Sequence, residues 1–179
     1  MGWICRKIID ALGVSRMYVP KRLQPYFVIN NEKYGANIII GGSLSCCGRQ
    51  EFSIDYKGKI KSSLFGHKFL YQSEDNIILQ AKCKTCGNEI LVFNSDTDGY
   101  DSCEHKIQEF FYEKLDSLLC PKCKGMYFSL DVSFEYQSKE ELEKEGIKEY
   151  ENAFSWIWCT IICESCGGKL KKFIDIETA

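Results

Sequence analysis

The chain has 179 residues, of which 45% are hydrophobic and 13% aromatic, so it can bury a core as one domain or two small ones. The net charge of −2 excludes a protein that is basic throughout. No stretch approaches the ~20 consecutive apolar residues of a membrane span, and residues 1–16 lack the continuous apolar core of a signal peptide. We therefore expect a cytoplasmic protein without a membrane partner, in which the 11 cysteines remain reduced.

Residues 1–33 read as a basic amino-terminal segment. Five basic residues stand against Asp10 alone within residues 1–29, a net charge of +4. These basic residues are Arg6, Lys7, Arg16, Lys21 and Arg22. Apolar residues recur at helical spacing over residues 3–12, which predicts a short helix. A polyanionic partner would be tolerated only at this end of the chain, because the remainder is acidic.

An internal repeat organises the rest of the chain. Residues 47–55 align with residues 123–131 at four identical positions of nine. The match resumes over residues 77–93 and 157–173, where alternating apolar residues lead into a Cys-x-x-Cys-Gly motif. Each copy predicts a cysteine turn, a strand, a variable excursion, a second strand and a second cysteine turn.

The repeat divides the chain into a first unit at residues 34–101 and a second unit at residues 120–179. Apolar residues at helical spacing predict a linking helix across residues 102–119. The excursion of the first unit predicts a hairpin, and that of the second, with Ser138 as N-cap, a short exposed helix or a loop. We therefore expect a β-rich α+β fold, with two tandem zinc-ribbon-like units joined by a helix and preceded by a short amino-terminal helix.

Strand alternation places an aromatic surface on the second unit. Ile157, Cys159, Ile161 and Cys163 share the face that leads to the metal ligands. The opposite face then carries Trp156, Trp158 and Thr160. We expect the first unit, the amino-terminal segment or a partner to cover this surface.

Four cysteines of the second unit have the spacing of a structural zinc site. They are Cys120, Cys123, Cys163 and Cys166. Two separated Cys-x-x-Cys pairs supply the four ligands of a tetrahedral Zn²⁺ ion and leave no position for water or substrate. The alternative is a pair of redox dithiols, which usually accompanies a βαβ pattern that is missing from this sequence.

The cysteine set of the first unit is incomplete by the same pattern. The repeat assigns Cys47, Cys83 and Cys86 as ligands, but Leu44 occupies the position equivalent to Cys120. The adjacent Cys46 is the first choice for a fourth ligand, with Cys103 and His105 in reserve. A first unit without metal is the alternative, so the sequence predicts one or two Zn²⁺ ions. Cys5 and Cys159 are interpreted as core thiols.

Other polar groupings do not indicate a catalytic site. Asp96, Asp98 and Asp101 resemble the start of a calcium-binding loop, but the required glutamate is missing, which favours a polar turn. His67 is isolated near the tip of the predicted hairpin, and no nucleophile–base arrangement can be assembled around it.

The motifs at Cys120–Cys123 and Cys163–Gly167 resemble those of the zinc-ribbon class, and the composition resembles that of a bacterial or phage protein. The resemblance implies a fold and a metal without selecting a function. Our leading hypothesis is a non-enzymatic module that binds and regulates or inhibits a protein partner. The alternatives are nucleic-acid binding, which the acidic charge disfavours, and a thiol-redox or metal-dependent enzyme using the incomplete first site.

Overall fold

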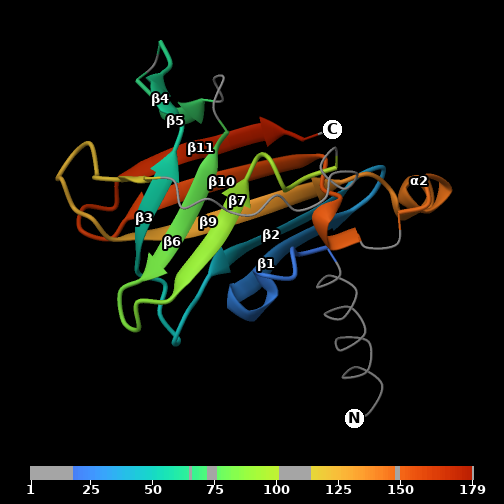
Figure 1. Cartoon of the computed structure of the whole chain (residues 1–179), viewed down its shortest axis with the longest axis horizontal. Helices are drawn as coiled ribbons and strands as arrows, with labels where there is room; N and C mark the ends of the chain where they lie inside the picture. The colour runs from blue at the N-terminus through green and yellow to red at the C-terminus, as the bar shows by residue number, and fades with distance from the viewer. Residues whose placement is uncertain (1–17, 65, 72–75, 101–113, 148–149, 179) are drawn as a thin grey trace.

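The computed structural model describes residues 18–64, 66–71, 76–100, 114–147 and 150–178, about half of which lie in strands (Figure 1). The elements are η1 (Gln24–Tyr26), β1 (Phe27–Tyr34), β2 (Ile38–Leu44), β3 (Phe52–Lys57), β4 (Lys59–Ser62), β5 (Lys68–Tyr71), β6 (Ile78–Cys83), β7 (Glu89–Asn94), β8 (Asp116–Ser117), β9 (Phe128–Tyr136), α2 (Lys139–Lys144), η3 (Tyr150–Asn152), β10 (Trp156–Cys163) and β11 (Lys169–Glu177).

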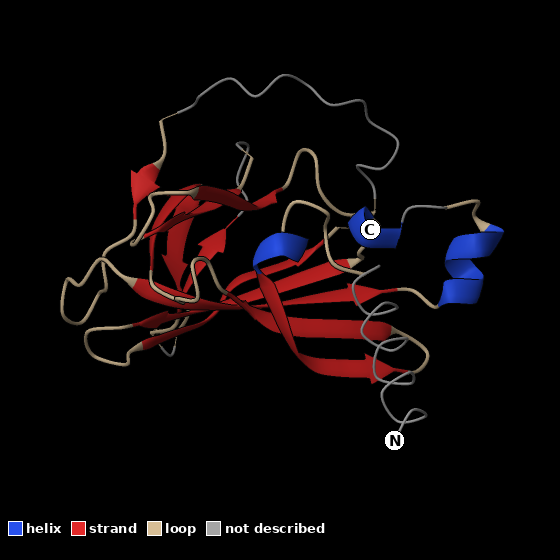
Figure 2. Cartoon of the chain, turned by 90° about the horizontal axis from the view of Figure 1, so that it is seen from below, coloured by secondary structure: helices blue, strands red, loops and turns tan. Residues whose placement is uncertain are grey.

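Nine of these strands form one curled sheet, a half-barrel that branches at β9 (Figures 1 and 2). One edge of β9 pairs with β10, which in turn pairs with β11. The other edge is shared: β2 pairs with its carboxyl-terminal part, and β3 touches it only at Phe52 and Phe128. One branch therefore continues through β2 to β1, and the other through β3 and β6 to β7. The hairpin of β4 and β5 forms a second small sheet.

One hydrophobic core lies inside the curl and includes side chains of both repeat units. The strands alternate as the period-2 pattern requires, so that every second residue of β9 and β10 is buried. Fully buried Phe134 of β9 packs against Phe154, with ring centroids 5.1 Å apart, and Phe154 packs against Phe93 of β7 at 6.4 Å. Burying each such ring contributes about 2 kcal/mol. The two units therefore share one core and pack directly against each other.

The α+β prediction with a joining helix is wrong, because the regular structure of the described residues is mostly β. The only α-helix among the described residues is α2, with six residues. Within the predicted linking helix, Asp116 and Ser117 instead form β8, which pairs with Asp55 and Tyr56 of β3. The amide of Leu118 donates to the carbonyl of Ile54 at 2.8 Å, and the Leu118 side chain is buried. Pairing with a strand from the first unit therefore overrides the local helical spacing.

Other expectations fall on residues that the structure does not describe. The amino-terminal helix lies within residues 1–17, and most of the linking segment lies within residues 101–113. The domain boundaries remain a prediction. The expected short helix of the second excursion is confirmed as α2, and Ser138 and Glu141 close its first turn as a reciprocal capping box.

The polar turn around Asp98 closes the first unit through a buried ion pair. Asp98 has only 3% of its side chain exposed, and Arg22 Nη1 donates to its Oδ1 at 2.7 Å. The backbone amide of Asn94 donates to Asp98 Oδ2 at 2.7 Å, and Arg22 Nε donates to the carbonyl of Leu91 at 2.9 Å. Arg22 therefore fastens the amino-terminal segment to the outer edge of β7.

Replacing Arg22 by alanine is expected to lower the free energy of unfolding by about 3 kcal/mol, because it leaves a buried carboxylate without its cation. Urea unfolding followed by circular dichroism measures this change. The matched control is Lys82→Ala, which removes an exposed ion pair with Glu89 (N–O distance 3.0 Å) and should cost below about 1 kcal/mol. Equal effects of the two variants would contradict the structural role assigned to Arg22.

Candidate metal centres

The carboxyl-terminal cysteine turns of the two units have the same backbone geometry. In the second unit the amide of Gly167 donates to the carbonyl of Cys163 at 2.8 Å, and in the first unit Gly87 donates to Cys83 at 2.9 Å. Both glycines have positive φ, +66° and +73°, a conformation that costs glycine little. Each turn follows a core strand, β10 or β6, and brings its two cysteines to one side.

The amino-terminal cysteine turns differ in length but reach the same result. In the second unit the turn spans Cys120 to Gly125, with the amide of Cys120 donating to the carbonyl of Gly125 at 2.9 Å. In the first unit Cys46 and Arg49 exchange two hydrogen bonds of 2.8 and 2.9 Å, so the turn is two residues shorter. Cys47 adopts a left-handed φ of +54°. This backbone conformation lets the adjacent side chains of Cys46 and Cys47 reach one site.

The structure brings together two clusters of four cysteines. In each cluster all four Sγ atoms lie within 4.8 Å of one another. The first cluster consists of Cys46, Cys47, Cys83 and Cys86, and the second of Cys120, Cys123, Cys163 and Cys166. These are the eight residues that the sequence proposed as ligands. Cys103 and His105, the reserve ligands of the first unit, and Cys5 lie outside the described residues.

The sulfur positions fit a tetrahedral zinc ion. A tetrahedron with Zn–S bonds of about 2.3 Å has edges of about 3.8 Å between sulfurs. The Sγ–Sγ distances are 3.6 Å for Cys120–Cys166 and for Cys123–Cys163. In the first cluster they are 3.6 Å for Cys46–Cys86 and 3.9 Å for Cys46–Cys47. All eight thiols are free, so the clusters are not disulfide-bonded. The donor set therefore suits Zn²⁺, with all eight thiolates as ligands.

Burial shows which cysteines are equivalent. In each turn the first cysteine is buried and the second is exposed, in both clusters alike. Cys46 therefore occupies the place of Cys120 although the repeat alignment puts Leu44 there. The sequence proposed Cys46 as the fourth ligand, but the repeat alignment did not show that Cys46 takes the place of Cys120. The reason is that a left-handed turn at Cys47 replaces the two extra residues of the longer loop.

Backbone amides favour the thiolate form that a metal requires. Burial acts against the charged form of Cys120, but hydrogen bonds from the amides of Cys123 and Lys122 and from the thiols of Cys166 and Cys123 together outweigh it and lower the pKa of Cys120 to about 6. The amide of Asn88 leads in lowering the pKa of Cys86 to about 7. Burial raises the pKa of Cys159 instead, as the interpretation of this residue as a core thiol requires. Each cluster thus contains at least one thiol prepared to deprotonate near neutral pH.

Equivalent residues of the two units meet where β3 touches β9. Phe52 and Phe128 pair antiparallel there, and each is the first residue of the equivalent strand in its own repeat, β3 and β9. The amide of Lys84 donates to the carbonyl of Glu51, and the equivalent amide of Glu164 donates to that of Tyr127, both at 3.0 Å. Lys84 also lies over the Tyr127 ring, with Nζ 4.6 Å from its centroid. The residues that flank the two centres are thus in direct contact.

No protein-family model, curated protein or solved structure matches this chain. The metal assignment therefore rests on the geometry of the cysteines themselves. Among the described residues, no helix is both long and apolar enough to cross a membrane.

We expect two zinc ions per chain, one for each cluster. Cys123→Ser and Cys86→Ser should each reduce the zinc content from two to one, because each variant leaves three thiolates at one centre. Elemental analysis together with thiol titration measures the content. Cys159→Ala is the matched control: it removes a buried thiol outside both clusters and should retain two zinc ions. Full zinc content in Cys123→Ser or Cys86→Ser would contradict the assignment.

Proposed function

We propose that this chain is a non-enzymatic, structural-zinc protein that acts as an interaction and regulatory module for a protein partner. The observation that carries this proposal is that both clusters supply four thiol ligands in a compact set. A zinc ion with four protein ligands has no open position at which to activate water or polarise a substrate. The two ions then serve to hold the strands that present a binding surface.

The proposed binding surface is the outer face of β10. Trp156 and Trp158 project from the side of the sheet opposite to the core, half-buried, with stacked rings whose centroids are 6.2 Å apart. Trp156 Nε1 donates to Asp175 at 2.7 Å, which fixes the orientation of its ring. Rigid aromatic side chains with an apolar face and a satisfied polar group are typical anchors of protein interfaces.

Acidic residues flank this tryptophan pair, and Lys172 lies beside Trp158, where it pairs with Asp175 at 2.9 Å. Cross-strand pairing puts Glu135 and Glu177 beside Trp156, and Asp175 beside Trp158. An apolar centre within an acidic rim complements a partner that places apolar side chains among basic ones. We therefore propose a protein partner with a basic rim around its contact site.

The amino-terminal basic residues offer less support for nucleic-acid binding. Two of the five are in ion pairs with buried carboxylates: Arg22 with Asp98, and Lys21 with Glu151 at 2.8 Å. These two cations are therefore already paired within the protein and contribute less to the attraction of a nucleic acid.

Cobalt substitution tests whether the metal sites are closed. Co²⁺ should bind both clusters with the visible spectrum of tetrahedral thiolate coordination, and added azide should leave this spectrum unchanged. Cys47→Ala supplies the positive control, because it opens one position at the first centre and should make the spectrum sensitive to azide. An azide-dependent spectrum in the unmodified protein would favour the enzyme alternative.

Removing the tryptophan pair should abolish partner binding without loss of zinc. Once a partner has been isolated and identified from source cells, Trp156→Ala/Trp158→Ala is expected to weaken the measured affinity at least tenfold, about 1.4 kcal/mol or more. Tyr34→Ala serves as the control, because Tyr34 is a half-exposed aromatic residue on β1 and should leave the affinity within twofold. Unchanged affinity in the tryptophan variant would place the interface elsewhere.

A further inference from the structure

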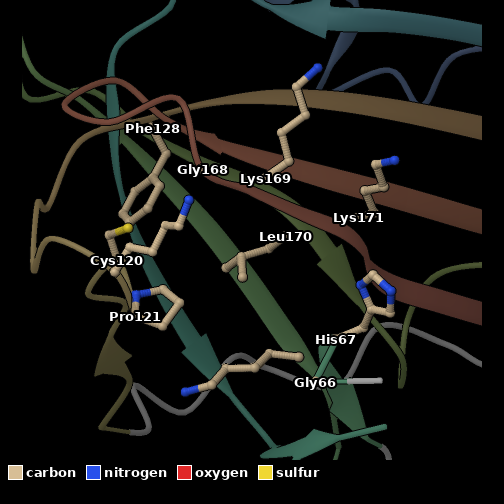
Figure 3. A pocket seen from close by; sticks show the side chains of 11 residues that line it. Gly66, His67, Cys120, Pro121, Phe128, Gly168, Lys169, Leu170 and Lys171 are labelled. Carbon is tan, nitrogen blue, oxygen red and sulfur yellow. The ribbon is translucent and has the colours of Figure 1, made fainter. Parts of the chain in front are cut away.

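A pocket of about 230 Å³ opens beside the second metal centre (Figure 3). Residues from both units line it: the turn between β4 and β5 of the first, and the Cys120 turn and start of β11 of the second. Leu170 lies in the middle of the view, with Cys120 and Pro121 to one side and His67 to the other (Figure 3). The pocket therefore exists only because the β4–β5 hairpin packs against β11.

The lining of this pocket is strongly basic. Five of its eleven residues are lysine or histidine and none is acidic: His67, Lys68, Lys122, Lys169 and Lys171. All five are exposed, and no ion pair of their side chains occurs in the part of the chain that the structure describes. Figure 3 shows the side chains of Lys169 and Lys171 extending from β11 away from Leu170, so their ammonium groups stand at the rim of the pocket and not over its apolar wall. The four lysines of this group create a local positive potential on a chain of net charge −2.

The repeat shows that the fold does not require these lysines. The equivalents of Lys169 and Lys171 in the first unit are Glu89 and Leu91, on a strand with the same role. The first unit also has no counterpart of Lys122, because its two cysteines are adjacent.

Balancing the charge of the metal centre does not account for the cluster either. A Zn²⁺ ion with four thiolates carries a net charge of −2, and both centres share this charge. The first centre has Glu89 where the second has Lys169. The positive charge gathered around this pocket is therefore available to a ligand.

We propose that this pocket binds the phosphate group of a phosphorylated ligand. A doubly charged phosphate offers three acceptor oxygens that several ammonium groups can contact at once, whereas a carboxylate is satisfied by fewer. Leu170 and Pro121 provide an apolar wall for the part of the ligand next to the phosphate. The volume suits a phosphate with its adjoining sugar rather than a whole large cofactor. The phosphate comes either from a free nucleotide or from the end of a nucleic-acid strand.

This proposal is independent of the proposed partner surface, and calorimetry on the zinc-loaded full chain tests it. The probes are inorganic pyrophosphate, adenosine monophosphate, and one short single-stranded oligonucleotide with either a 5′-phosphate or a 5′-hydroxyl. We expect saturable 1:1 binding of at least one phosphorylated probe, weakened at higher salt. Lys169→Gln/Lys171→Gln should weaken it at least tenfold. Lys33→Gln/Lys114→Gln removes the same charge from exposed positions outside the pocket and should change it less than twofold.

The probes distinguish the two sources of the phosphate. Binding of the mononucleotide or of pyrophosphate without the oligonucleotide supports a small ligand, and preference for the 5′-phosphorylated strand over its 5′-hydroxyl form supports a strand end. Two outcomes overturn the proposal: no probe binds, or both double variants lose affinity equally. If no probe binds and the pocket variant also loses zinc, the lysines only balance the charge of the metal centre.

Discussion

The fold depends on cysteine sulfurs that converge from distant parts of the chain. Cys120 and Cys166 are 46 residues apart, and Cys46 and Cys86 are 40 apart, yet each pair of sulfurs is 3.6 Å apart. Closing such a long loop costs chain entropy, and the core of a small β-unit contributes little free energy to offset that cost. The free energy of metal binding offsets it instead. A metal ion bound to each cluster would hold β3 in register with β6, and β9 in register with β10. The segments that connect these paired strands differ between the units: a hairpin in the first and α2 in the second.

The packing of the two units explains why the excursions differ. The sheet branches at β9, so β3 and β2 share one edge of that strand, and the aromatic core built on Phe134, Phe154 and Phe93 crosses the boundary between the repeats. Duplication supplies two similar units, but their mutual contact makes their surroundings unequal. The β4–β5 hairpin of the first unit packs on β11, and this contact forms the basic pocket beside the second centre.

Two surfaces of opposite character follow from this arrangement. The outer face of β10 presents stacked tryptophans within an acidic rim, and the start of β11 presents lysines around an apolar wall. Both rest on strands that the second metal centre anchors. We propose that a protein with two structural metal sites can in this way still offer two chemically distinct binding surfaces.

The sequence by itself determined the ligand chemistry, because Cys-x-x-Cys spacing is a local property and the repeat identified seven of the eight cysteines, with Cys46 proposed as the eighth because it adjoins Cys47. It also identified the capped helix α2 and the alternation that sends Trp156 outward. Only the tertiary structure decided the rest. Asp116 and Ser117 form a strand because β3, some 60 residues earlier in the chain, offers them an edge for pairing. The local spacing of apolar residues carries no information about such a distant partner. Cys46 replaces Leu44 because a left-handed backbone at Cys47 shortens the turn, and the basic pocket exists because separate units meet.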